Sequence, residues 1–303
     1  MQILPSPVAS AAPCDSTSHI ENPIRLREDL EERGYVFVRG LLPEALLREV
    51  RADIANVLAR AGWLDPRFDP LEARANPGVG PFAESVSPEY APVYDRILHL
   101  ESFHSLPHHP RLVRLFRDLF DEEPLLHPRH IARIVFPNAT EETTPPHQDY
   151  IHIRGSKNTL TAWFPLGDCP RDLGGLVALE GSHHLGLLPF VEARGAGNKG
   201  IVIKDFKGRW VGTDYRAGDV MVFNSLTVHS GSPNQTGNCL RLSMDVRATP
   251  LSEPVHPSSL LPHMQRVTWE QIYSGWKSAS HQRYWEKLNL VLAEDGRTAV
   301  KGY

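Results

Sequence analysis

The sequence has few cysteines, no long apolar run and no excess of basic residues. Its three cysteines, Cys14, Cys169 and Cys239, are far apart and form no CxxC pair. This excludes a disulfide scaffold and a structural zinc finger, and it favours a reducing, cytoplasmic setting. No segment reaches the roughly 18 apolar residues of a spanning helix, so we expect no membrane partner. With 32 Lys and Arg against 36 Asp and Glu, the formal charge of -4 argues against nucleic acid.

Histidine, proline and glycine stand out among the residues that are present. The chain of 303 residues contains 15 His, which invites a search for metal ligands. Its 26 Pro and 22 Gly favour many short elements joined by turns. Hydrophobic residues make up 41% and charged residues 22%, as in an ordinary folded protein. The length suffices for one large domain with a well-buried core.

The first half of the chain has mainly helical spacing. Residues 1–22, rich in Ala, Ser and Pro, predict a flexible N-terminal tail without signal-peptide features. Apolar residues then recur at helical spacing over 24–61, around a β-rich run at 35–40, and again over 90–104 and 112–120. Residues 64–86, rich in Pro, Gly, Asp and Arg, predict a long loop that serves as a lid.

From about residue 124 the pattern changes to short apolar runs separated by turn residues. These runs lie at 130–136, 160–166, 176–179, 201–204, 220–223 and 240–246. They predict a sandwich or barrel of antiparallel strands. Helical spacing returns over 268–292, so residues 250–303 form a predicted C-terminal helical extension. We therefore expect a mainly β fold with flanking α-helices, in a single domain over 23–303.

Two histidines and one aspartate carry the metal signal. In His147-Gln148-Asp149, positions i and i+2 of an extended strand face the same side, so an imidazole and a carboxylate share one cavity. His229 follows an apolar run that an Ala-Gly-Asp turn introduces. Two His and one carboxylate form the facial triad of non-haem iron oxygenases. The same ligands also make a catalytic zinc site, so a zinc-dependent hydrolase is the alternative.

A charged residue inside an apolar run supplies a further feature. Arg241 lies in the run 240–246, where an unpaired buried charge is costly and a carboxylate partner is needed. Its planar guanidinium suits a bidentate carboxylate, for which the distal carboxylate of 2-oxoglutarate is a candidate. A zinc hydrolase requires no such arginine. Asp245 and Arg247, two positions apart, share one strand face, which predicts a structural role for Arg247.

Taken in order, these motifs resemble the phytanoyl-CoA dioxygenase (PhyH) family of Fe(II)- and 2-oxoglutarate-dependent oxygenases. The resemblance runs from about residue 24 to residue 250. It rests on the run GYVFVRGLL at 34–42, His147-Gln148-Asp149, Trp163, the turns at 174–176 and 180–183, and Ala217-Gly218-Asp219 with His229, Asn234 and Arg241. The ordered set is far more specific than any of its members.

The resemblance implies a double-stranded β-helix core, the cupin-like jelly roll, with helices packed outside. It implies that His147, Asp149 and His229 bind Fe(II), that Arg241 binds 2-oxoglutarate, and that O2 is consumed. It places Gln148 and Trp163 in the cosubstrate pocket. Two positions after the second iron histidine the family usually has a serine, whereas this chain has Gly231, which leaves Ser230 and Ser232 as candidates. His130 and Arg133 are candidates for an earlier cosubstrate contact.

The implied activity is oxidation of a small-molecule metabolite, with release of succinate and CO2. Asp149 favours hydroxylation, desaturation or ring formation over halogenation, because related halogenases replace this carboxylate by a small residue. No basic cluster resembles a CoA-phosphate site, so the family name does not define the substrate. The expected specificity residues are Arg67 and Arg74 in loop 64–86, and Tyr150, His152 and Arg154 after the iron tripeptide. We expect a monomer or a homodimer.

Several other motifs have simpler interpretations. The GxGxxG match at 195–200 precedes a β-rich run rather than a helix, so it predicts a loop and not a dinucleotide site. His183 and His184 belong to a supporting turn. His104, His108 and His109 sit near a helix end, with a second metal site as the less favoured interpretation. A non-catalytic jelly-roll binding module is the remaining hypothesis for the whole chain.

Overall fold

The computed structural model describes residues 9–82, 84, 87–139, 143–202 and 208–293. The α-helices are α1 (Pro23–Arg33), α2 (Glu44–Arg60), α3 (Tyr90–Leu98), α4 (Glu101–Ser105), α5 (Pro110–Phe120), α6 (Tyr150–Ile153) and α7 (Trp269–Tyr273). The strands are β1 (Tyr35–Val38), β2 (Pro124–Leu126), β3 (Ile131–Val135), β4 (Leu160–Pro165), β5 (Leu176–Leu179), β6 (Phe190–Glu192), β7 (Lys199–Ile201), β8 (Trp210–Val211), β9 (Val220–Asn224), β10 (His229–Gly231) and β11 (Arg241–Pro250). The predicted mainly β fold with helices is confirmed.

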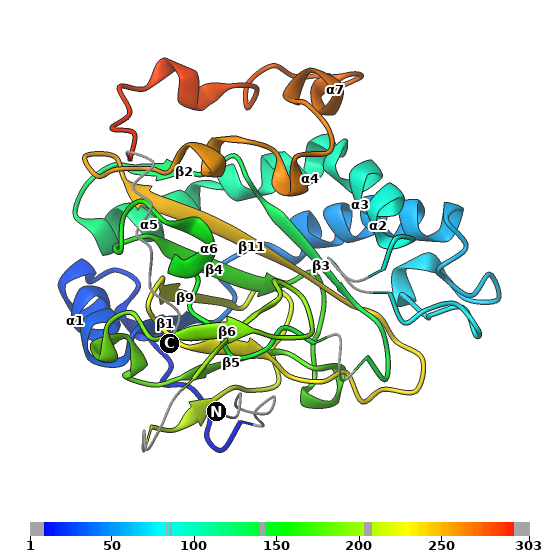
Figure 1. Ribbon diagram of the computed structural model, residues 1–303, viewed down its shortest axis with the longest axis horizontal. Helices are drawn as coiled ribbons and strands as arrows, with labels where there is room; N and C mark the ends of the chain where they lie inside the picture. The colour runs from blue at the N-terminus through cyan, green and yellow to red at the C-terminus, as the bar shows by residue number, and fades with distance from the viewer. Residues whose placement is uncertain (1–8, 83, 85–86, 140–142, 203–207, 294–303) are drawn as a thin grey trace.

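The strands form one large antiparallel sheet and two smaller ones. The large sheet has the order β1-β9-β4-β11-β2, and β3 also pairs with the long strand β11. A second sheet has the order β10-β5-β8, and β6 pairs with β7. In Figure 1 the helices α2, α3 and α4 lie on one side of the large sheet, and β5 and β6 lie on the other. The smaller strands therefore cover the face of the large sheet that the helices leave free (Figure 1).

Side chains alternate between the two faces of the large sheet, and one face is packed against the helices while the other carries polar residues. Leu242, Met244, Val246 and Ala248 of β11 join the main core, with β4 and β9 residues of the same face and with helices α1 to α5. The alternate residues of β11 include Arg241, Asp245 and Arg247. Because successive side chains of a strand point to opposite faces, these charged groups lie on the side away from the helices.

A second apolar cluster joins the large sheet to the smaller one. Tyr35 and Phe37 of β1, Trp163 of β4 and Phe223 of β9 pack in it with Leu176 and Ala178 of β5 and Val211 of β8. Because residues of both sheets share one buried cluster, the two sheets pack face to face. The space between them is where His147, His229 and Arg241 meet.

Capping signals explain the first helix. The Asn22 side chain accepts a hydrogen bond from the Arg25 N–H, and Pro23 occupies the first helical position. Gly34 ends the helix at φ 79°, a left-handed conformation that favours glycine. The chain then enters β1 at once, as the predicted helix, strand, helix order over 24–61 requires.

Two predicted segments differ in detail from the structure. Instead of a long helix over 268–292, the C-terminal segment contains the short helix α7 and a 3-10 turn at Tyr284–Lys287. Gly275, at φ 87°, and Ser274, Ser278 and Ser280 account for these interruptions. At the other end, residues 9–22 of the predicted tail contact the body of the fold, with Ala11 bridged to Val211 and Asp15 to Phe37. No helix of the described residues is long and apolar enough to span a membrane.

Candidate active site

The backbone holds two of the predicted ligands next to each other. His147 and His229 form an isolated antiparallel bridge, in which the N–H of each donates to the carbonyl of the other over 3.0 Å. Their ring centroids are 4.2 Å apart. His229 begins β10, and the hydroxyl of Ser182 supports it by accepting a hydrogen bond of 2.8 Å from the Val228 N–H. The predicted role of the Gly-Ser-His turn as a support agrees with this contact.

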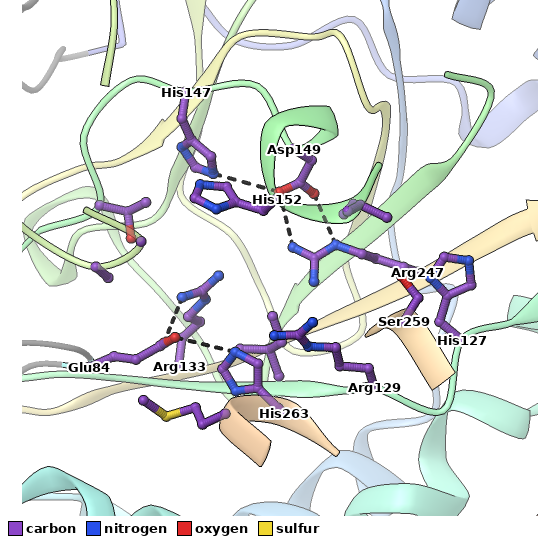
Figure 2. Close-up of a pocket in the computed structure, with 16 residues that line it drawn as sticks. Glu84, His127, Arg129, Arg133, His147, Asp149, His152, Arg247, Ser259 and His263 are labelled. Atoms are coloured by element: carbon purple, nitrogen blue, oxygen red, sulfur yellow. Dashed lines mark hydrogen bonds and ion pairs between the residues drawn. The ribbon is translucent and has the colours of Figure 1, made fainter. Parts of the chain in front are cut away.

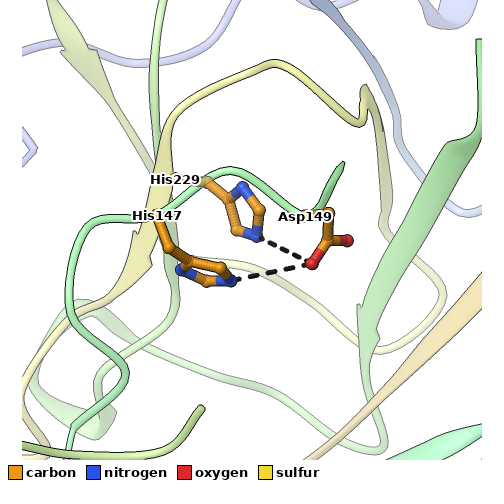
Figure 3. A group of neighbouring side chains, drawn as sticks. All are labelled: His147, Asp149 and His229. Atoms are coloured by element: carbon orange, nitrogen blue, oxygen red, sulfur yellow. Dashed lines mark ion pairs between the residues drawn. The ribbon is translucent and has the colours of Figure 1, made fainter. Parts of the chain in front are cut away.

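Both imidazoles present the same nitrogen to the cavity. His147 Nδ1 lies 2.9 Å from the Pro145 carbonyl oxygen, and His229 Nδ1 lies 3.0 Å from that of Thr227. A carbonyl oxygen can only accept, so each Nδ1 carries a hydrogen, and in the neutral ring Nε2 is the nitrogen with the lone pair. The two Nε2 atoms lie 3.6 and 3.9 Å from Asp149 Oδ1. Figure 3 shows the three groups converging.

This triad is the one group of three or more potential metal ligands among the described residues, with ligand atoms within 4.8 Å of one another. Burial, with repulsion from His147, lowers the pKa of His229 to about 3, so its imidazole is neutral at pH 7. A neutral imidazole with a free Nε2 is the form that binds a metal. The donor set therefore fits a divalent metal ion.

The backbone around Asp149 differs from the expectation. The sequence predicts an extended strand, but Asp149 has φ −60° and ψ −31° and precedes the short helix α6. Its carboxylate is positioned by neighbouring side chains instead. Thr161 Oγ1 donates to Oδ2 over 2.6 Å, and Arg247 donates from Nη2 to Oδ1 over 3.0 Å and from Nε to Oδ2 over 3.2 Å. Arg247 and Thr161 face each other across strands β11 and β4.

Asp149 is ionised in this setting. Burial by itself would raise the pKa of Asp149, but the Arg247 guanidinium and the two histidines hold it well below its usual range. Its side chain is 2% exposed, and that of Arg247 is 8% exposed. The role of Arg247 is thus more specific than the predicted structural one, because it orients the candidate metal ligand.

A small cavity of about 30 Å³ joins the two histidines of the triad to Arg241. Trp163 and Phe223 line it, together with His147, His229 and Gly231. Arg241 is 4% exposed, and its Nε has no hydrogen-bond partner among the described residues. Its Cζ lies 5.9 Å from the centroid of the Trp163 ring. A buried guanidinium without a carboxylate is costly, so the cavity is suited to an anion bound between Arg241 and the triad.

Arg133 and Gln148, also predicted as cosubstrate residues, already have protein partners. Arg133 lines the same cavity but already pairs with Asp245 and Glu84 over 2.8 and 2.9 Å. Gln148 is fully buried and binds the Gly186 and Leu226 carbonyls and the Leu188 N–H. Its amide therefore ties backbone segments together behind the triad.

Neither serine candidate extends into the Arg241 cavity. Ser230 donates to the Thr144 carbonyl over 2.8 Å, and Ser232 lines a separate cavity beside Arg171. A Cβ placed on Gly231 would lie 3.8 Å from Arg241 Nη2, so the position between the two serines is the one beside Arg241. His130 lies on the helical side of β3, where its ring packs near Phe103 and His104.

A larger cavity of about 300 Å³ adjoins the triad at His147 and Asp149. Of the predicted substrate residues, His152 lines it, with its ring centroid 5.8 Å from that of His147. Tyr150 and Arg154 lie on α6 and at its end but do not line the cavity. Arg74 hydrogen-bonds Asn238 and pairs with Glu72, and Arg67 pairs with Asp65, so neither lines the cavity.

Glu84, Arg129 and Arg247 also line this cavity, and the sequence interpretation gave none of them a role in the site. Loop 64–86 contributes Glu84, which pairs with Arg133 and with His263 from the C-terminal segment. Arg129 and Arg247 complete the charged wall, as Figure 2 shows. The sequence could have placed Arg247 in the site, because an even number of positions separates it from Arg241 along β11 and both side chains therefore face the same side. The loop 195–198 also lines the cavity through Ala196 and Gly197 and leads into β7, as expected for a loop.

With this geometry established, comparison with known families identifies the chain. The phytanoyl-CoA dioxygenase (PhyH) model matches residues 30–242. The protein therefore belongs to the phytanoyl-CoA dioxygenase family. This confirms the family recognised from the sequence and the enzyme class, a dioxygenase.

Individual relatives agree with this assignment. The chain is 26% identical over 264 residues to a 1-deoxypentalenic acid 11-beta-hydroxylase of Streptomyces exfoliatus, which covers 82% of this chain and 88% of the relative. The enzyme of the same name from Streptomyces arenae is 25% identical over the same shares. Among solved structures, the epimerase SnoN, in complex with Fe3+, alpha ketoglutarate and nogalamycin RO, has a TM-score of 0.55 at 24% identity, covering 78% of this chain and 87% of SnoN. The carbocyclase SnoK has a TM-score of 0.52 at 22% identity, covering 84% of this chain and 94% of SnoK.

Proposed function

We propose that the protein is an Fe(II)- and 2-oxoglutarate-dependent dioxygenase that hydroxylates, or otherwise oxidises at a C–H bond, a small-molecule metabolite. One observation carries the proposal: two imidazole Nε2 atoms and a carboxylate converge beside a cavity that ends at a buried arginine without a carboxylate partner. With dioxygen, Fe(II) and 2-oxoglutarate supply the oxidising chemistry and release succinate and CO2. The hydroxylase relatives and the iron- and alpha-ketoglutarate-bound SnoN support this proposal.

The residues divide into three tasks under this proposal. His147, Asp149 and His229 bind Fe(II), and Arg247 with Thr161 keeps the Asp149 carboxylate aligned. Arg241 binds the distal carboxylate of 2-oxoglutarate, with Trp163 as the wall beside it. The cavity on the His152 side receives the substrate and keeps it away from bulk water.

We further propose that the core is a double-stranded β-helix. The face-to-face packing of the β1-β9-β4-β11-β2 sheet on the β10-β5-β8 sheet, with a site between them, supports this architecture. A single catalytic domain over 23–303, acting as a monomer or homodimer on a small molecule, is the simplest organisation. Sedimentation of the purified chain tests the oligomeric part of the proposal.

An anaerobic spectrum tests the function directly. Fe(II) together with 2-oxoglutarate is expected to give a visible charge-transfer band in the wild-type protein and in Arg216→Met, a matched arginine variant at an exposed position. The band is expected to be lost in Asp149→Ala and to require far more 2-oxoglutarate in Arg241→Met. Oxygen-dependent succinate formation should follow the same order.

A zinc hydrolase would behave differently in the same assays. It would give no band with Fe(II) and 2-oxoglutarate, and it would hydrolyse an ester or amide only after zinc is added. Arg241→Met would then leave activity unchanged, because that mechanism gives the arginine no task. This combination of results would exclude the dioxygenase proposal, and oxygen-dependent succinate production would exclude both the hydrolase and a non-catalytic binding module.

A further inference from the structure

The substrate side of the active-site cavity contains one cation that the proposed reaction does not use. Arg129 lines the 300 Å³ cavity and is partly buried. It precedes β3 by two residues and lies two and four positions before Ile131 and Arg133. It therefore extends their row of side chains, which faces away from the helices. It donates a hydrogen bond of 3.3 Å to the Ser258 carbonyl. No carboxylate of the described residues forms an ion pair with Arg129.

The other charged groups of the two cavities are paired. Arg133 is held between Glu84 and Asp245. The remaining contact of Glu84 is His263 Nε2 at 3.3 Å, and Arg247 is bound bidentately by Asp149. The nearby carboxylates therefore already have partners, and Arg129 has to find its counter-ion elsewhere.

The count of charged groups in the two cavities also leaves Arg129 without a counter-ion. The cavity walls contain four arginines (Arg129, Arg133, Arg241 and Arg247) and three carboxylates (Glu84, Asp149 and Asp245). Burial lowers the pKa of His127 to about 3, so this histidine adds no charge at pH 7. Fe(II) and the 2-oxoglutarate dianion cancel each other. One positive charge is left, and it belongs to the arginine without a partner.

We propose that Arg129 binds a carboxylate of the substrate, so that the substrate is a small monocarboxylic acid. This inference rests on the proposed function, because 2-oxoglutarate is what neutralises Arg241. A single surplus charge matches a monoanion better than a phosphate dianion or the several phosphates of coenzyme A. The planar fork of a guanidinium binds both oxygens of a carboxylate.

The rest of the cavity is predominantly polar, and Ile131, Ile153 and Met264 are among its few apolar lining residues. In Figure 2, Arg129 lies on the opposite side of the cavity from His147 and Asp149. A molecule anchored at Arg129 therefore extends across the cavity towards the triad, and the carbon presented for oxidation is remote from the carboxylate. Such anchoring fixes the position that reacts.

Paired acid and ester probes test the inference. The probes are 1-deoxypentalenic acid, cyclohexanecarboxylic acid and decanoic acid, each with its methyl ester, and decyl phosphate as a dianion. Binding is measured by calorimetry under anaerobic conditions, on protein loaded with Fe(II) and 2-oxoglutarate. At least one acid is expected to bind the wild-type protein about 10- to 100-fold more tightly than its ester, the usual range for a charged hydrogen-bonded pair.

Variants separate a binding role from a structural one. Arg129→Met is expected to reduce acid binding to the level of the ester and to leave ester binding unchanged. Arg129→Lys, which keeps the charge but loses the fork, is expected to be intermediate, and Arg216→Met should behave as the wild type. The acid-to-ester ratio of the wild-type protein provides the same test without any variant, should Arg129→Met not fold.

The outcomes are distinguishable. Acids that bind no better than esters, or no acid binding at millimolar concentration, would overturn the inference, as would tighter binding of decyl phosphate than of decanoic acid. If the charge-transfer band forms in all these proteins while acid selectivity is absent, the Arg129 inference fails and the proposed function stands. If acid selectivity is present and no band forms, the proposed function fails instead.

Discussion

The pair formed by Arg247 and Asp149 permits a quantitative test of how the site is held together without metal. The two side chains are 8% and 2% exposed and meet through two hydrogen bonds of 3.0 and 3.2 Å. Replacing Arg247 by Met leaves a buried carboxylate without its cation. Breaking one side of a buried pair costs about 3–5 kcal/mol, whereas replacing both sides by apolar groups is often close to neutral.

A double-mutant cycle measures this coupling. Arg247→Met and Asp149→Leu are each expected to lower the free energy of unfolding of the metal-free protein by about 3 kcal/mol, and the double variant to lose less than either single variant. Urea denaturation at pH 7 with a chelator present provides the measurement. At this pH the contribution of Asp149 is complete, because its folded pKa is depressed and the stabilisation is lost only at acidic pH.

An ion pair outside the site serves as the control. Arg39 and Asp219 meet at 2.7 Å, but the Arg39 side chain is 38% exposed. Their coupling is therefore expected to be about 1 kcal/mol or less. If the Arg247–Asp149 coupling is no larger than this, or if the two single effects simply add, the pair does not organise the triad and the reasoning is wrong.

Three further predictions concern other parts of the site and its support. Arg241→Met should raise the KM for 2-oxoglutarate by about 10- to 100-fold, and thermal melting should show no loss of stability, because a buried cation without a partner is removed. Burial lowers the pKa of His104 to about 4, so the His104 contribution to the unfolding free energy should be lost as pH drops from about 6.5 to about 4, and the fall over this range should be smaller in His104→Leu. Ser182→Ala removes the acceptor of the Val228 N–H and should cost about 1–3 kcal/mol in urea denaturation, with weaker Fe(II) binding by titration.

The metal ligands could be predicted because their residue types and order along the chain are specific. Two of them, His147 and His229, are held by a backbone bridge that an extended run predicts. The third was predicted for an incorrect local reason. Asp149 is helical in φ and ψ, and its carboxylate reaches the histidines because Arg247 and Thr161 position it. Contacts between strands so distant in sequence cannot be obtained from a tripeptide.

Strand parity explains which cosubstrate candidates reach a cavity and which do not. His130 and Arg133 lie in one apolar run, but three positions separate them, so they face opposite sides of the sheet. Arg133 therefore enters both cavities, whereas His130 packs against Phe103 on the helical side. Once the strand is accepted, this assignment follows from the sequence alone.

The same parity argument links the two arginines of β11 to different tasks. Arg241, Asp245 and Arg247 alternate with buried apolar residues, so all three face the site. Arg241 alone has no acidic partner among the described residues, because Asp245 pairs with Arg133 and Asp149 pairs with Arg247. An arginine on a polar strand face is thus a candidate ligand-binding residue only if the carboxylates near it already form ion pairs with other residues. That criterion selects Arg241 for the cosubstrate and Arg129, just before the adjoining strand β3, for the substrate.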